Sequence, residues 1–164
     1  MTAPAWYVSA AWLLLALFAQ ACFMHAFTIH NVEPNLVLVA VVWYAIRVEG
    51  WRAAAYGLAA GFALDLLSFG TTGGAWTIAT TAVALVSSTI SRGFFADSVP
   101  LVATITFVAT LVVRLIFWVV MSFEGYPRGL AMIHFHEALF EAVLNALVMT
   151  VVIVVNRRFD SRYA

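Results

Sequence analysis

The chain has 164 residues, of which 65% are hydrophobic and only 10% are charged, against about 25% charged residues in an ordinary soluble domain. A soluble protein of this size would expose apolar patches large enough to cause aggregation, whereas a bilayer lets apolar side chains face lipid. The net charge is zero and no basic run is present, so nucleic-acid binding has no electrostatic basis.

Six apolar segments follow one another along the chain, and we interpret each as a transmembrane helix. A helix needs roughly 20 apolar residues to cross about 30 Å of hydrocarbon. The long runs lack the alternation of membrane-barrel strands, so the expected fold is an all-α bundle of about six helices. The expected spans are Ala5 to Thr28, Pro34 to Arg47, Trp51 to Phe69, Ala75 to Ile90, Val99 to Phe123 and Gly129 to Val155.

The second segment is short. Pro34 is expected in its first turn, where the missing N–H is not needed, and Arg47 is expected to reach the membrane interface. No internal repeat and no linker divides the sequence, so residues 1–164 are expected to form a single transmembrane domain.

The first segment needs a comparison with a signal peptide, because Ala19-Gln20-Ala21 is similar to a cleavage site. Residues 1–46 contain no Lys or Arg, so the basic region that opens a signal peptide is missing. We therefore expect this segment to be retained as the first helix.

The arginine positions predict the orientation of the bundle, because cytoplasmic loops carry an excess of basic residues. With six spans, one side of the membrane holds Arg47, Arg52, Arg92, Arg157, Arg158 and Arg162. Arg128 lies on the other side, and Arg114 lies within the fifth span. Both termini are therefore expected in the cytoplasm.

The third segment carries small residues and one carboxylate at every fourth position, namely Ala53, Gly57, Gly61 and Asp65. This spacing places them on one helical face. The Gly57-x-x-x-Gly61 pair lets another backbone approach closely, so that dispersion and weak contacts accumulate. The approaching helix belongs either to a partner protein or to this same chain, and the sequence leaves both alternatives open.

Ionisable residues within the fifth and sixth segments predict a polar cluster. The sixth segment carries a stripe with spacings of three, four and four residues, made of His134, Glu137, Glu141 and Asn145. Arg114 lies at a similar depth to Glu137, about eight residues from the outer end of its span. An unpaired Arg at that depth costs roughly 2.5–3.5 kcal/mol, so we expect Arg114 to pair with these carboxylates, with Asp65 as a further candidate. The cluster either fixes helix register or lines a pocket or proton path open to the outside.

Metal and catalytic motifs are not expected. His134 and His136 are two residues apart and point in different directions on a helix. The run from His136 and Glu137 begins like a zincin motif, but Phe140 stands where the second His is required. No nucleophile triad, phosphate loop or nucleotide fingerprint is present, so the sequence predicts neither an enzyme nor a cofactor.

Two stretches together resemble the MreD family of bacterial rod shape-determining proteins. The first is Pro34-Asn35-Leu36 at the start of a short helix. The second is Gly57-x-x-x-Gly61-Phe-Ala-Leu-Asp65-Leu-Leu-Ser68 followed by the glycine-rich loop from Gly70 to Gly74, in which Gly70 and Gly73 are the matching positions. Chain length, five or six spans and short loops also match the family over the whole chain.

The resemblance implies a non-enzymatic scaffold in the bacterial inner membrane. Such proteins bind MreC, a single-span protein with a periplasmic domain. Through MreC they connect the MreB cytoskeleton to the RodA transglycosylase and a class B penicillin-binding protein. On this interpretation the small-residue faces of the bundle would dock partner helices, with the membrane helix of MreC as the expected partner.

Two alternative functions remain. The MreD fold is similar to the substrate-binding S-components of vitamin transporters, so the polar cluster could serve as a ligand pocket. S-components carry an Ala-x-x-x-Ala pair on the first helix, whereas here Ala16 is followed by Gln20 and Ala19 by Phe23. A proton-coupled carrier using Glu137 or Glu141 is disfavoured, because one small bundle offers no second half for alternating access.

Overall fold

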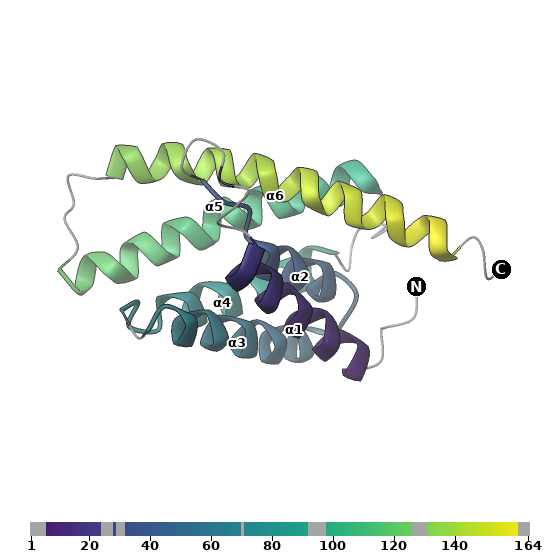
Figure 1. Ribbon diagram of the computed structural model, residues 1–164, viewed down its shortest axis with the longest axis horizontal. Helices are drawn as coiled ribbons and strands as arrows, with labels where there is room; N and C mark the ends of the chain where they lie inside the picture. The colour runs from purple at the N-terminus through teal and green to yellow at the C-terminus, as the bar shows by residue number, and fades with distance from the viewer. Residues whose placement is uncertain are drawn as a thin grey trace.

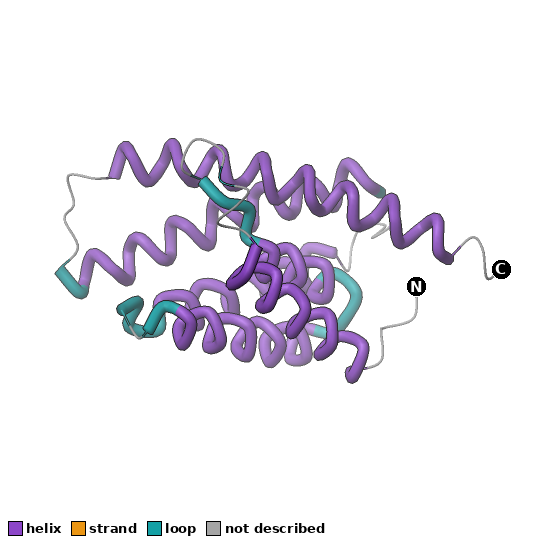
Figure 2. The backbone as a smooth tube through the Cα atoms, in the orientation of Figure 1, coloured by secondary structure: helices purple, strands orange, loops and turns teal. Residues whose placement is uncertain are grey.

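The computed structural model describes residues 6–23, 28, 32–69, 71–91, 98–125 and 131–160. Every regular element in this part of the chain is a helix, which confirms the all-α expectation (Figures 1 and 2). The helices are α1 (Trp6–Phe23), α2 (Leu36–Ala45), α3 (Gly50–Leu67), α4 (Ala75–Ser91), α5 (Val99–Phe123) and α6 (Ala131–Asp160). Of the orientation-setting arginines, Arg92, Arg128 and Arg162 lie outside the described residues, as does Gly70 of the glycine loop.

Two helices, α5 and α6, are long and apolar enough to cross a membrane, and α1, α2 and α4 are shorter apolar helices. The extended α5 and α6 pack lengthwise against each other, and α3 packs closely along α4 (Figure 1). α1 begins and α6 ends at the same end of the bundle (Figure 1). Many large apolar side chains on the outside of these helices are exposed, including Phe62, Leu115 and Val151, as expected for surfaces that face lipid.

The second segment forms a shorter helix than predicted. With 10 residues, α2 is only about 15 Å long, half of the roughly 30 Å of a hydrocarbon core. Pro34 does not lie in its first turn as expected, because Asn35 is the N-cap and accepts a hydrogen bond from the N–H of Leu38 at 2.9 Å. The helix therefore starts two residues later than Pro34.

The core of the protein is built around α2. Its residues Val37, Leu38, Val41 and Val42 are fully buried, and the helix contacts all five others. Apolar side chains on every face are typical of a helix surrounded by other helices. One group of buried residues joins α2 to α4, α5 and α6, and a second joins it to α1, α3 and α4. A short helix in the centre of the bundle thus holds the longer ones together.

Candidate functional site

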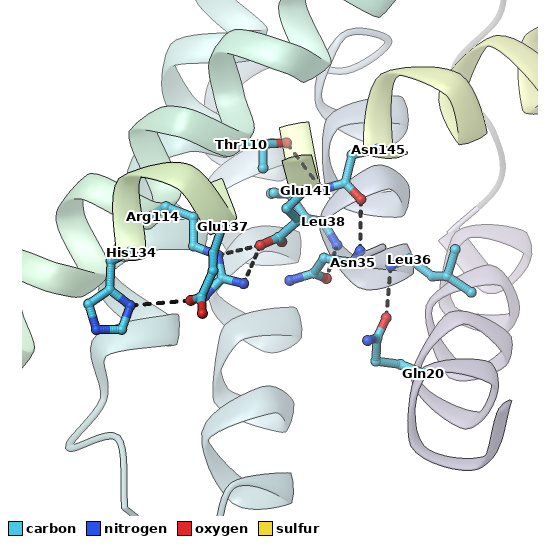
Figure 3. Close-up of polar contacts among 10 residues, drawn as sticks. All are labelled: Gln20, Asn35, Leu36, Leu38, Thr110, Arg114, His134, Glu137, Glu141 and Asn145. Atoms are coloured by element: carbon cyan, nitrogen blue, oxygen red, sulfur yellow. Dashed lines mark hydrogen bonds and ion pairs between the residues drawn. The ribbon is translucent and has the colours of Figure 1, made fainter. Parts of the chain in front are cut away.

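Arg114 on α5 forms an ion pair with Glu141 on α6 (Figure 3). Its Nε and Nη2 atoms both donate to the same carboxylate oxygen. The Glu141 side chain is almost fully buried, whereas Arg114 is about a quarter exposed, at 28%. A buried carboxylate without a counter-charge is strongly destabilising, so this pair ties α5 to α6.

The guanidinium of Arg114 also contacts α4. Its carbon lies 5.8 Å from the centre of the Trp76 ring, within the range of a cation–π interaction. Trp76 in turn packs on Phe117, with 4.7 Å between the ring centres. Arg114 is therefore held between three helices and does not extend into lipid.

Asn145 connects α6 to the beginning of α2. Its Oδ1 atom accepts a hydrogen bond from the N–H of Asn35 at 2.7 Å, and its Nδ2 donates to Thr110 at 3.1 Å. The N–H of Leu36 donates to Oε1 of Gln20 on α1 at 2.8 Å. The first N–H groups of a helix lack intrahelical partners, and in a membrane they must be satisfied within the protein. Side chains from α1 and α6 supply these partners.

Sequence reasoning gave no role to three members of this network, namely Gln20, Asn35 and Thr110. A lone glutamine in an apolar segment is a usable signal, because an amide in hydrocarbon needs a partner. Asn35 carries the N-cap signature directly before an apolar run. Thr110 offers no signal, because a threonine in a helix satisfies its hydroxyl by bonding to the backbone carbonyl four residues earlier, here that of Thr106.

The remaining stripe residues lie one and two turns away from the ion pair. Nδ1 of His134 is 3.4 Å from a carboxylate oxygen of Glu137, and both side chains are about one third exposed. Although Glu137 matches Arg114 in depth, Arg114 binds Glu141 instead. Figure 3 shows His134, Glu137, Arg114, Glu141 and Asn145 in one row that leads toward the start of α2.

Asp65 lies at the end of α3 and caps α4. One carboxylate oxygen accepts from the Thr72 hydroxyl at 2.6 Å and from the N–H of Trp76 at 3.2 Å. The other accepts from the N–H and the hydroxyl of Thr77 at 2.9 and 2.6 Å. Negative charge is favourable at a helix N-terminus. Among the described residues Asp65 forms no ion pair with Arg114, so it belongs to the α3–α4 pair and not to the cluster.

Replacing Asp65 with asparagine should therefore destabilise the α3–α4 pair. The amide would direct an NH2 group at donors that now bind a carboxylate oxygen, and hydrogen bonds to charged groups contribute about 1.5–3 kcal/mol each. We expect a lower thermal midpoint in detergent and faster amide exchange in the first turn of α4. Ser68→Ala is the matched control, because its hydroxyl bonds only to the Leu64 carbonyl within α3. An unchanged midpoint for Asp65→Asn would contradict this role.

The small-residue face of α3 is covered by α4 of the same chain. A Cβ atom added at Gly57 would lie 2.7 Å from the carbonyl oxygen of Thr80, and one at Gly61 would lie 2.5 Å from the Cα of Thr77. The Thr80 hydroxyl donates to the carbonyl of Gly57 at 2.7 Å. Ala53 is fully buried as well. Of the two alternatives for this face, packing within the chain is the one that the structure contains.

Gly73 lies in the α3–α4 loop with a φ of +51°, a backbone conformation that favours glycine. An added Cβ would collide with the carboxylate of Glu124, which follows α5. The loop after α3 and the turn after α5 therefore lie in contact at one end of the bundle.

Two pockets open at this end, on either side of the polar cluster. The larger, of about 620 Å³, lies between the ends of α1 and α3 and the beginnings of α2, α4 and α6, and Glu33, Asn35 and Glu141 are on its wall. The smaller, of about 330 Å³, lies between the α3–α4 loop, α5 and α6. Arg114 and Glu137 line both. Binding sites for small molecules and peptide segments have volumes of about 300–1,000 Å³.

The cluster presents charged and hydrogen-bonding groups to the larger pocket. Within the described ranges, no group of three His, Cys, Asp or Glu side chains could hold a metal ion. The acidic side chains Glu33, Glu137 and Glu141 face a single arginine in the larger pocket. The pocket therefore favours a ligand with hydrogen-bond donors or positive charge.

The chain matches the model of a known protein family. The model of the rod shape-determining protein MreD family matches residues 2–159, almost the whole chain. The chain belongs to the MreD family. No match was found among the curated proteins or among the solved structures. Family membership confirms the resemblance seen in the sequence and, with the apolar helices, identifies a rod-shape-determining membrane protein of a structural, not a known enzymatic, family.

Proposed function

We propose that this MreD-family protein is a non-enzymatic scaffold of the rod complex in the bacterial inner membrane and binds MreC directly. Through MreC it would act with MreB, RodA and a class B penicillin-binding protein to support peptidoglycan synthesis. Family membership supports the cell-shape role.

In the proposed topology all six helical segments lie in the membrane and both termini are cytoplasmic. Arg47, Arg52, Arg157 and Arg158 support this orientation, because they lie where α2 and α6 end and α3 begins, at the same end as the start of α1. The positive-inside rule assigns that end to the cytoplasm. The pocket end, where α1, α3 and α5 finish, then faces the periplasm.

One observation carries the proposal that MreC engages the pocket end. The Gly57–Gly61 face is filled by α4, so it is not open to a partner helix. The larger pocket is open, and the charged side chains on its wall are net acidic. It lies on the side where the resemblance places the extracytoplasmic domain of MreC. A membrane-proximal segment of MreC with exposed donors would contact the carboxylates of Glu33 and Glu137 there.

The test uses two adjacent leucines of α3. Leu67 lines the larger pocket and Leu66 lines neither pocket, although both side chains are exposed. Leu67→Trp should narrow the pocket and weaken the binding of MreC. We expect the recovery of MreC in a pull-down from membranes to fall by about tenfold, which corresponds to a loss of roughly 1.4 kcal/mol of binding free energy. Leu66→Trp should leave recovery unchanged. Equal recovery with both variants, at equal amounts of folded protein, would exclude the pocket as the docking site.

A second candidate is a small-molecule subunit of the S-component kind, and the pocket volume of about 620 Å³ favours it. That function requires a metabolite in the pocket. Mass spectrometry of the denatured, purified protein would detect a vitamin-sized compound at near one copy per chain. A compound lost in Leu67→Trp and retained in Leu66→Trp would support transport over scaffolding.

A further inference from the structure

A third cavity lies at the opposite end of the bundle and is almost entirely apolar. It has a volume of about 380 Å³. Its walls are α1 and α6, and α2 forms its floor, so we name it the α1–α6 groove. Its lining includes Trp12 and Ala16 from α1, Ala40 and Trp43 from α2, and Val151 and Asn156 from α6.

The length of the groove corresponds to one leaflet of a bilayer. Along α2 it extends from Leu36 to Trp43, which is about 10 Å at 1.5 Å per residue. One leaflet contributes about 15 Å of the hydrocarbon core. The groove stops where α2 begins, beside the network of Asn35 and Asn145. A membrane-spanning helix of a partner would need a contact surface about 30 Å long, whereas a lipid acyl chain needs only the thickness of one leaflet, about 15 Å.

Two arginines follow residues that line the groove, Arg47 four residues after Trp43 and Arg157 directly after Asn156. Asn35 and Asn145 are hydrogen-bonded to each other, and α2 and α6 run in the same direction from them (Figure 1). Arg47 follows Asn35 by twelve residues, and Arg157 follows Asn145 by the same number. The guanidinium of Arg47 lies 4.3 Å from the ring centre of Trp43, and Arg157 is exposed directly after Asn156.

The positive charge of Arg47 and Arg157 distinguishes between the molecules that could occupy the α1–α6 groove. A phosphate between two guanidinium groups forms charge-assisted hydrogen bonds. A partner's transmembrane helix would instead bring its own basic residues to this cytoplasmic flank and meet like charge. The apolar lining, a length that fits within one leaflet and the two arginines beyond its end all match a lipid whose headgroup is negative.

We propose that the α1–α6 groove is a binding site for one anionic phospholipid of the cytoplasmic leaflet. One acyl chain lies over Ala40 between α1 and α6, and the phosphate lies between Arg47 and Arg157. The site goes beyond the scaffold function and does not depend on it, although it rests on the proposed topology, in which the arginine end of the bundle lies at the cytoplasmic surface of the membrane.

Native mass spectrometry of the full-length protein, titrated with phosphatidylglycerol or phosphatidylcholine, tests the site. We expect one phosphatidylglycerol to be retained preferentially. A basic residue near a membrane surface contributes roughly a fivefold preference for anionic lipid, so Arg47→Gln and Arg157→Gln should each weaken retention about fivefold. Ala40→Phe, which fills the floor of the groove, should remove the bound lipid of either kind.

Arg52→Gln is the matched control, because Arg52 lies at the same end on α3, which does not line the groove. It should leave lipid retention unchanged. Equal retention of the two lipids by the unaltered protein, or equal loss in all three arginine variants, would overturn the proposal. So would an Ala40→Phe variant of unchanged thermal midpoint that keeps its lipid. If Ala40→Phe keeps the lipid and loses MreC, the groove is a helix-docking site instead.

Discussion

Gly61→Ala should destabilise the protein by at least about 1–3 kcal/mol, the usual cost of adding a methyl group to a fully packed site. The new Cβ would lie 2.5 Å from both the Thr77 Cα and the Trp76 carbonyl oxygen, and it would overlap the Thr80 hydroxyl. Two of these three contacts are with backbone atoms, so α4 must move as a whole. We expect a lower thermal midpoint in detergent, and loss of the folded species for Gly61→Leu.

Ala59→Leu is the control for Gly61→Leu. Ala59 lies two residues earlier on α3 and is exposed, so the added bulk meets lipid or detergent. Its thermal midpoint should stay close to that of the unaltered protein. If Gly61→Leu folds normally but releases MreC, the glycine face would be a partner surface, and the packing against α4 would not be the reason for the glycines.

Breaking the Arg114–Glu141 pair should have the largest effect among the ionisable residues. Removing one partner of a buried ion pair costs about 3–5 kcal/mol, because the other charge stays buried without compensation. Arg114→Met should therefore lower the thermal midpoint strongly, because Glu141 stays buried. Glu141→Met should lower it less, because the remaining Arg114 is partly exposed. The double variant should be more stable than the sum of the two single effects predicts, with a coupling free energy of about 1–3 kcal/mol.

The double variant also separates structure from function at this cluster. Replacing both charges with apolar side chains of similar size is often neutral for stability. A stable double variant that no longer recovers MreC would indicate that the charges serve partner binding, whereas normal recovery would indicate that they only fix helix register. Arg52→Met, an exposed arginine at the start of α3, should change neither midpoint nor recovery.

The sequence predicted the helical segments well because each depends on local composition. All six expected spans begin within about two residues of the helices found, as boundary uncertainty allows. The helix of the second segment starts two residues later than expected, because Asn35, which follows the proline, is the N-cap. The first residue of a helix depends on which residue caps it, and neighbouring residues compete for the capping position.

Which side chains pair with each other was harder to predict than which helical face carries them. Arg114 was expected to pair with Glu137 and Glu141, and the match in depth favoured Glu137. The structure pairs Arg114 with Glu141, one turn further along α6. The axial position of one helix relative to the next depends on the lengths of the loops between helices, and a shift of one turn is only 5.4 Å. Similarly, the spacing put Asp65 on the glycine face, but only the structure shows that α4 starts where its carboxylate can cap it. Gly57 and Gly61 were expected to form a close-approach face, and the structure places α4 against them. Which helix approaches this face could not be read from the sequence, because it depends on the three-dimensional packing.

The half-length of α2 has a consequence for how the protein opens. From Asn35 onward the central helix fills the arginine end of the bundle with Val37, Val41 and Ala45, all without exposed surface. The pocket end lacks this central element, and its two pockets lie beside the polar cluster, whereas the α1–α6 groove at the arginine end lies over α2. Local opening has the lowest free energy where buried apolar contacts are fewest. The ends of α1, α3 and α5 should therefore separate first, while the arginine half stays packed around α2. A partner could then change the packing of one half of the bundle without loosening the other half.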